Sequence, residues 1–224
     1  MNVLAIPSAR SWKKIVLVTL GDLMHIDNDS QTTTKGTLQQ ADGRMAKIFN
    51  FTVDSITEFL LALRVLAPVE VIYIPGNHDR VTGYMAVKAV AMRFWNDKEV
   101  AFDIEPRSEK WRVFGRSLVG WHHGDAPSKN MRNWLQHKAR REFGEAKYCE
   151  IHTGHYHSQS GKETNRDINT EGEMSGVTIR SLPTISPSSF WESQQLYSSV
   201  LRTLMCFVWN DGIGLREIWY SNIG

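Results

Sequence analysis

Two continuous apolar runs, each of which stops at a short polar turn, constrain this chain more than any other feature of its sequence. The first run, KKIVLVTL, covers residues 13–20 and stops at Gly21-Asp22. The second run, VEVIYIP, covers residues 69–75 and stops at the tetrapeptide Gly-Asn-His-Asp, residues 76–79. Apolar runs without polar alternation are typical of strands covered on both faces. We therefore predict parallel strands whose carboxyl ends carry polar turns.

The segments between and after these runs have helical periodicity. Apolar residues recur at helical spacing from residue 44 to about residue 66, and Pro68 ends this predicted helix. A second helix is predicted over residues 84–96, and a basic amphipathic helix over residues 128–145. Residues 23–43 are polar, and we expect them to form a loop.

The rest of the chain favours strands. Residues 111–121 are predicted to form a hairpin and residues 147–154 a strand, and the part from 176 to 224 is rich in β-forming residues. The dipeptide Asp211-Gly212 is a hairpin-turn signal. We find no linker or internal repeat, so we predict one α/β domain over residues 1–224.

The composition excludes several classes of protein. A hydrophobic fraction of 42% and a charged fraction of 22% are ordinary globular values, so a disordered, collagen-like or disulfide-rich chain is excluded. No apolar stretch approaches the length of about 20 residues that a membrane span needs, and we expect no membrane partner. The two cysteines lack metal-knuckle spacing, which favours reduced thiols and a cytoplasmic location. A net charge of +2 does not demand a nucleic-acid partner.

Four predicted strands end in clusters of residues that bind metals or move protons. In open α/β folds, functional sites form beyond the carboxyl ends of strands, so we expect these clusters to converge. Carboxylate oxygen, amide oxygen and several imidazoles suit divalent transition metals such as Mn, Fe, Co, Ni or Zn. They do not suit calcium, which prefers oxygen ligands alone.

The order of the clusters resembles the calcineurin-like metallophosphoesterase family, and the resemblance covers residues 13–160. The clusters are Gly21-Asp22, Gly76-Asn77-His78-Asp79, His123-Gly124 and Gly154-His155-Tyr156-His157. This resemblance implies a β-sandwich flanked by helices, in four layers α/β/β/α, with the β-rich part 176–224 in its second sheet. The segments TTTKGT and DGRMAKIF are similar to phage-encoded members.

The resemblance implies a role for each cluster residue. One metal would be bound by Asp22, Asn77, His123 and His155, and another by Asp22 and His157. Asp22 would bridge the two ions, His78 would be the catalytic imidazole, and Asp79 would orient it. Two ions about 3.5–4 Å apart can clamp the attacking and leaving oxygens of a phosphoryl displacement and acidify bound water. Arg80 is a candidate phosphate contact.

The sequence departs from the family pattern at its start. The family's first motif, Asp-x-His, is missing, because residues 1–20 contain no Asp and no His. Three explanations are open: the chain is a fragment of a longer enzyme, it is a natural short form that keeps mainly one metal site, or other ligands replace the missing ones. The replacements would be His25, Asp27, Asp29 or another chain, although a solvated loop is the favoured interpretation of HIDND. The fold would then lack its first strand and helix.

The favoured function is metal-dependent phosphoester hydrolysis with one or two Mn, Fe, Ni or Zn ions. A phosphodiesterase or nuclease-like activity, with DNA as a partner, is favoured over a phosphomonoesterase, and activity would be weak with one incomplete site. A phage-encoded enzyme would act in the host cytoplasm. The alternatives are an impaired phosphoesterase fold that serves as a binding module, and a metal enzyme of different chemistry. A pure binding module has no use for His78.

Three further predictions concern other polar residues. His122 is an alternative to His123, but adjacent strand residues point to opposite faces and Gly124 favours His123. His152 is expected to be a satisfied core histidine. The basic helix is expected to present a solvated face, or to attract phosphate if it borders the site; its cations are Lys129, Arg132, Lys138, Arg140 and Arg141.

Overall fold

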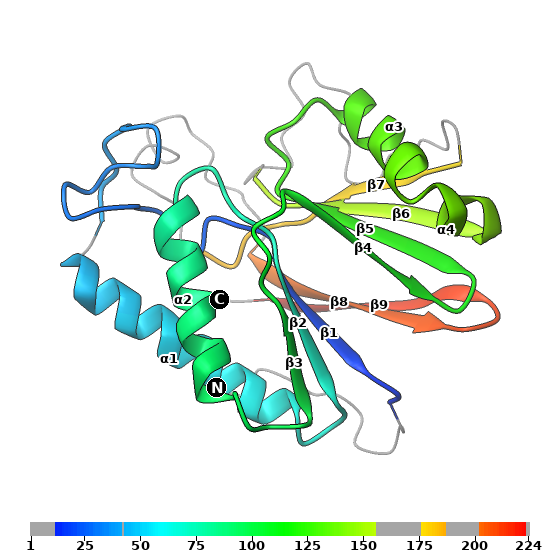
Figure 1. Cartoon of the computed structure of the whole chain (residues 1–224), viewed down its shortest axis with the longest axis horizontal. Helices are drawn as coiled ribbons and strands as arrows, with labels where there is room; N and C mark the ends of the chain where they lie inside the picture. Colours follow the sequence, from blue (N-terminus) through cyan, green and yellow to red (C-terminus); the bar gives the residue numbers. More distant parts are fainter. Residues whose placement is uncertain (1–11, 42, 156–175, 187–201, 223–224) are drawn as a thin grey trace. The chain divides into compact units, whose positions relative to one another are not determined.

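The computed structural model describes residues 12–41, 43–155, 176–186 and 202–222. The chain divides into two compact units, Met1–Ser108 and Glu109–Gly224, each with its own sheet and helices (Figure 1). The prediction of one domain stays a prediction, because two compact units can belong to one domain or to two. Of the predicted site residues, His157 lies outside the described residues.

The described part of the first unit holds a three-stranded parallel sheet in the order β1-β2-β3. Its strands are β1 (Ile15–Thr19), β2 (Val69–Tyr73) and β3 (Val100–Asp103). In the register of this sheet, Ile15 pairs with Val69, which pairs with Val100. The two predicted parallel strands are therefore confirmed. The third was not predicted, because its four residues are too few to show a periodicity.

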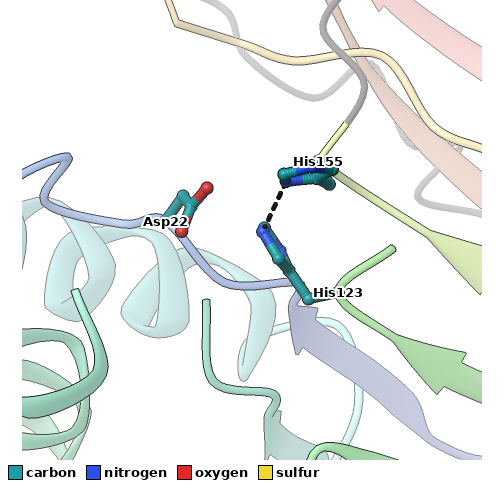
Figure 2. A group of neighbouring side chains, drawn as sticks. All are labelled: Asp22, His123 and His155. Carbon is teal, nitrogen blue, oxygen red and sulfur yellow. Dashed lines mark hydrogen bonds between the residues drawn. The ribbon is translucent and has the colours of Figure 1, made fainter. Parts of the chain in front are cut away.

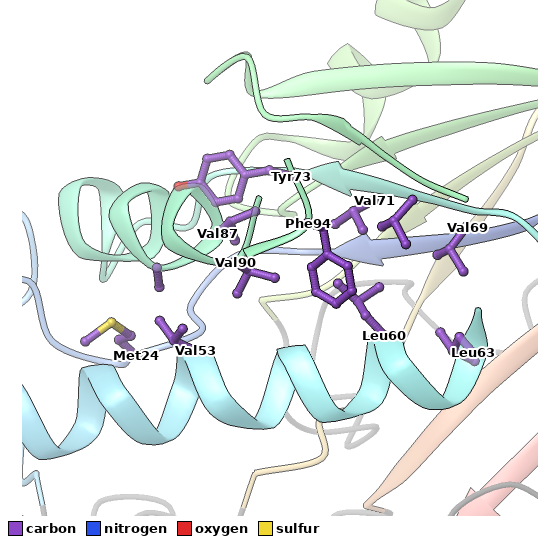
Figure 3. Close-up of a cluster of buried hydrophobic side chains, with 12 residues drawn as sticks. Met24, Val53, Leu60, Leu63, Val69, Val71, Tyr73, Val87, Val90 and Phe94 are labelled. Carbon is purple, nitrogen blue, oxygen red and sulfur yellow. The ribbon is translucent and has the colours of Figure 1, made fainter. Parts of the chain in front are cut away.

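Two helices cover one face of this sheet, namely α1 (Met45–Leu63) and α2 (Arg80–Arg93) (Figures 1 and 3). The side chains of Leu60, Val71 and Val87 are fully buried where the helices meet the strands. Burial of one such side chain stabilises the fold by about 1.5–3 kcal/mol. This apolar layer fixes the helices against the sheet, and with them the turns that follow β1 and β2.

Helix α2 begins at Arg80, four residues before the predicted start. A carboxylate from the polar loop caps it: Asp27 Oδ1 accepts hydrogen bonds from the backbone N–H groups of Val81 (3.0 Å) and Thr82 (2.8 Å). The first N–H groups of a helix have no partner within the helix, and a negative charge is favoured there. The loop of residues 23–39 is thus bound to α2, and this long-range cap sets the start of the helix.

The described part of the second unit holds a four-stranded sheet in the order β4-β5-β6-β7. Strands β4 (Glu109–Phe114) and β5 (Ser117–His122) form the predicted antiparallel hairpin. Strands β6 (Tyr148–Thr153) and β7 (Thr178–Ser181) continue the sheet in parallel with β5. The carboxyl ends of β5 and β6 are therefore neighbours at one edge, so the turns after them lie side by side.

One face of this sheet is covered by α3 (Ser128–Lys138) and α4 (Arg140–Glu145), with Leu118, Leu135 and Ile151 fully buried between the layers (Figure 1). The predicted single helix over 128–145 breaks at Ala139, whose φ of −100° and ψ of 39° are not helical.

A hairpin of β8 (Thr203–Asn210) and β9 (Gly214–Asn222) contacts the opposite face of this sheet, and its turn contains the predicted Asp211-Gly212. The rings of His152 and Phe207 lie 4.3 Å apart between centroids. Since Ile151 packs under the helices, the next residue along the strand points the other way. His152 is therefore the core histidine that was predicted.

A buried ionic group joins β6 to β7 under this hairpin. Glu150 accepts hydrogen bonds from Arg180 at 2.7 and 3.1 Å, and its Oε2 lies 3.1 Å from His152 Nε2. Burial alone would raise the pKa of Glu150, but the bonds from His152 and Arg180 outweigh it and lower that pKa. Burial lowers the pKa of His152. His152 is therefore neutral at pH 7, and its Nε2–H donates a hydrogen bond to the ionised Glu150.

The structure confirms the mixed α/β class. It contains several sheets and four helices within the described ranges. In those same ranges, no helix is long and apolar enough to cross a membrane.

We predict that His152 lowers the free energy of unfolding by up to about 1.4 kcal/mol per pH unit as the pH is lowered from about 7.5 to 5.5. The folded pKa of His152 is depressed, so the unfolded chain takes up the proton first. His152→Gln keeps a donor for Glu150 but does not titrate. Urea unfolding at several pH values should show a shallower slope for this variant. Identical slopes for the unaltered chain and for His152→Gln would contradict the depressed pKa of His152.

Candidate metal centre

The turn after β1 places Asp22 at the carboxyl end of the first sheet. Gly21 and Asp22 have φ values of 86° and 54°, in the left-handed region that non-glycine residues rarely adopt. The carboxylate of Asp79 holds this conformation, since Oδ1 accepts from the N–H of Asp22 (3.2 Å) and Oδ2 from the N–H of Met24 (2.9 Å). Asp79, after β2, thereby fixes the turn after β1.

The two turns of the first unit are in close contact. Asp22 Oδ1 accepts a hydrogen bond from the backbone N–H of His78 at 2.9 Å. A Cβ atom at position 76 would lie 2.1 Å from Asp22 Oδ1 and 2.2 Å from Asp22 N. Only glycine fits at position 76, which explains why the tetrapeptide begins with this residue.

Asp79 is 1% exposed, and its surroundings raise the pKa of its carboxyl to about 6. Burial is the main cause; the hydrogen bond from Met24 lowers the pKa and the charge of Asp22 raises it. We predicted that Asp79 orients the His78 ring. The carboxylate instead binds backbone N–H groups of the β1 turn, because those donors are buried beside it. This is a correction of the expected role, and Asp79 is a positioning residue for Asp22.

The His78 ring has another histidine as its neighbour. His78 Nδ1 lies 3.3 Å from Nδ1 of His25, and the ring centroids are 5.1 Å apart. His25 has a φ of 64° and is half-buried. The favoured interpretation of HIDND as a solvated loop therefore fails for His25, although Asp29 is exposed.

Asp27, another proposed replacement ligand, is held by hydrogen bonds at both carboxylate oxygens. Its Oδ1 accepts from the first amides of α2, and its Oδ2 accepts from the hydroxyl of Thr34 at 2.7 Å. A carboxylate with both oxygens engaged in this way caps a helix and holds a loop. Of the three proposed replacements within this chain, only His25 meets another predicted site residue.

The other two predicted residues of this turn flank His78. Asn77 is half-buried directly after Gly76. Arg80 is exposed at the start of α2, and its backbone N–H donates to the Thr34 hydroxyl at 3.1 Å. Asn77 as a ligand and Arg80 as a phosphate contact remain predictions.

The second unit contains a histidine pair at the ends of β5 and β6. His155 Nδ1 lies 3.2 Å from His123 Nε2, and Figure 2 shows the two rings directed toward each other. The ring centroids are 4.9 Å apart. His123 is 2% exposed, and His155 has a φ of 67°. The predicted meeting of these two residues is confirmed.

His122 does not take part in this pair. Its Nδ1 accepts the backbone N–H of Gly124 at 2.9 Å, and burial lowers the pKa of its ring. A Cβ atom on Gly124, which has a φ of 120°, would lie 2.7 Å from the carbonyl oxygen of Gly154. Only a residue without a Cβ atom fits at position 124, so Gly124 lets the two turns approach closely.

The spacing of the pair fits a shared metal ion. An imidazole nitrogen lies about 1.15 Å from the ring centre, and a metal–imidazole bond is about 2.1 Å long. Two rings that point at one ion at an angle of about 100° therefore place their nitrogens about 3.2 Å apart and their centres about 5.0 Å apart. The values of 3.2 and 4.9 Å for His123 and His155 agree with both distances.

Sequence reasoning named His25 as a possible replacement ligand but missed its contact with His78, and it missed the loop contacts of Asp27 and Thr34. Within the first unit, the structure brings together Asp22, His78 and Asp79; within the second, it brings together His123 and His155. The signal for the missed residues was the ligand-rich HIDND segment. Comparisons with protein-family models, with curated proteins and with solved structures each find no match.

We predict that Asp79→Ala lowers the free energy of unfolding by several kcal/mol, because it leaves two N–H groups without an acceptor, each at a cost of about 1–3 kcal/mol. Asp79→Asn keeps one acceptor oxygen and should cost less. Urea denaturation measures both variants. Asp29→Ala, which removes an exposed carboxylate, is the matched control. An equal effect of the Asp79→Ala and Asp29→Ala changes would show that Asp79 does not hold the turn.

Proposed function

We propose that this protein is a metal-dependent phosphoester hydrolase. The proposal depends chiefly on the His123–His155 pair, whose nitrogens lie at the spacing of two ligands of one ion. It is supported by the order of the four clusters, which resembles that of calcineurin-like metallophosphoesterases. The sandwich arrangement of that family belongs to the same proposal.

We propose that His123 and His155 bind one ion, and the resemblance of the cluster order supports Asp22 and the side-chain oxygen of Asn77 as its further ligands. Imidazole with oxygen ligands suits Mn, Fe, Co, Ni or Zn. Such an ion supplies Lewis acidity and an acidified water molecule.

His78 is the proposed catalytic residue. Its backbone N–H is bound to Asp22 and its Nδ1 faces His25, so its Nε2 is the atom left to meet a substrate. A proton on Nε2 can stabilise charge on the leaving oxygen or be donated to it. Asp79 acts indirectly, through the position of Asp22.

A phosphodiester, with DNA as one example, is the proposed substrate class. The exposed cations of the second unit that support it are Lys138 and Arg140, while Arg141 is paired with Glu145 at 3.2 Å. Arg132 is half-buried, and the Lys129 side chain is not among those described. Cations of this kind attract phosphate in a salt-dependent way.

The test is hydrolysis of bis-p-nitrophenyl phosphate by the purified chain, with and without added manganese. We expect metal-dependent turnover, which chelation abolishes. His78→Ala should lower turnover by about 10²–10⁴-fold and leave the ion at His123 and His155 in place. The matched control is His137→Ala, which removes an exposed histidine of α3.

Two further measurements separate the parts of this proposal. His123→Ala and Asp22→Asn should each weaken binding of the same ion, and their effects should not be additive in the double variant. Faster turnover of p-nitrophenyl phosphate would instead favour a phosphomonoesterase. Metal binding without turnover of either ester would contradict an enzymatic function and favour the binding module.

A further inference from the structure

We propose that His25 and His78 form a second metal-binding pair, which lies wholly in the first unit and binds an ion through their two Nδ1 atoms. This inference rests on the proposed function for its catalytic meaning, but its geometry stands alone. The four clusters include no residue from the loop that holds His25, which was considered only as a replacement for the missing Asp-x-His ligands.

The geometry of this pair matches that of His123 and His155. The two Nδ1 atoms are 3.3 Å apart and the ring centroids 5.1 Å apart. With a metal–nitrogen bond of about 2.1 Å, two rings that meet one ion at about 103° have these same separations. Both separations are therefore those expected of two imidazoles that bind one ion.

A direct hydrogen bond accounts less well for these distances. In a straight N–H···N bond both rings point along the line between the nitrogens, which would place the centroids about 5.6 Å apart at this N···N distance. The observed 5.1 Å is shorter. The N···N distance of 3.3 Å also exceeds the usual hydrogen-bond length of about 2.9–3.0 Å.

The backbone around His25 is held on both sides. The N–H of Met24 donates to Asp79 at 2.9 Å, and the carbonyl of Ile26 accepts from the Thr82 hydroxyl at 2.8 Å. His25 itself has a φ of 64°, a conformation that persists only where the surroundings enforce it. The fold thus stabilises an unfavourable backbone conformation that aims this imidazole at His78.

Two imidazoles leave coordination positions open, as catalytic metal sites do. Asp22 lies next to the pair, because its carboxylate accepts the backbone N–H of His78. Water or a phosphate oxygen would fill the remaining positions. His78 would then keep its Nε2 proton as a donor toward a bound phosphate, which agrees with the charge-stabilising role proposed above.

The test is titration of the full chain with Zn²⁺, followed by isothermal calorimetry and by elemental analysis. We expect two ions per chain. His25→Ala should remove one ion or weaken its binding at least about tenfold, since even partners outside the ligand shell contribute 10–100-fold. His123→Ala should affect the other ion, and the His137→Ala control should affect neither.

A measurement on the unaltered chain covers the case in which His25→Ala does not fold. On addition of Zn²⁺, Nδ1 of His25 and of His78 should take the ¹⁵N shift of a metal-bound nitrogen, and Nε2 of both rings that of a protonated nitrogen. Unchanged resonances, or full zinc binding by folded His25→Ala, would overturn the inference. Zinc at His25 without ester hydrolysis would refute only the proposed function, and hydrolysis without zinc at His25 would refute only this inference.

Discussion

The hydrogen bonds from the β1 turn to the Asp79 carboxylate are the interaction on which the arrangement of the first unit depends. They join two turns that are more than fifty residues apart in sequence. The carboxylate is buried, and burial raises its pKa to about 6, so ionisation of this group in the interior is unfavourable. Its hydrogen bonds stabilise Asp22 in a backbone conformation that a free turn would rarely adopt.

Much of the fold could be predicted because its signals are local. The apolar runs gave β1 and β2, and helical periodicity gave α1. The early start of α2 could not be predicted, because its cap comes from Asp27, 54 residues earlier. The break at Ala139 and the short strand β3 also carry no periodic signal. Contacts between distant residues decide such features.

The candidate site, too, could be predicted only where its signals are local in the sequence. The glycines and histidines that follow strands were visible in the sequence, and the pairing of His123 with His155 followed from neighbouring parallel strands. The partner of His78 was not visible, because His25 belongs to a polar loop without periodicity. Asp79 was expected to orient His78, and only its contacts with backbone amides revealed that it serves Asp22.

The left-handed backbone at Asp22, His25 and His155 restricts how these positions can evolve. Besides glycine, the residues best tolerated in this conformation are Asn, Asp and His. All three carry metal-ligating atoms, whereas Glu, an equally good ligand, is not among them. Exchange of ligands at these turns is therefore confined to a small set of short polar side chains. The backbone conformation would limit the ligands at these positions to Asn, Asp and His even if the preferred metal changed.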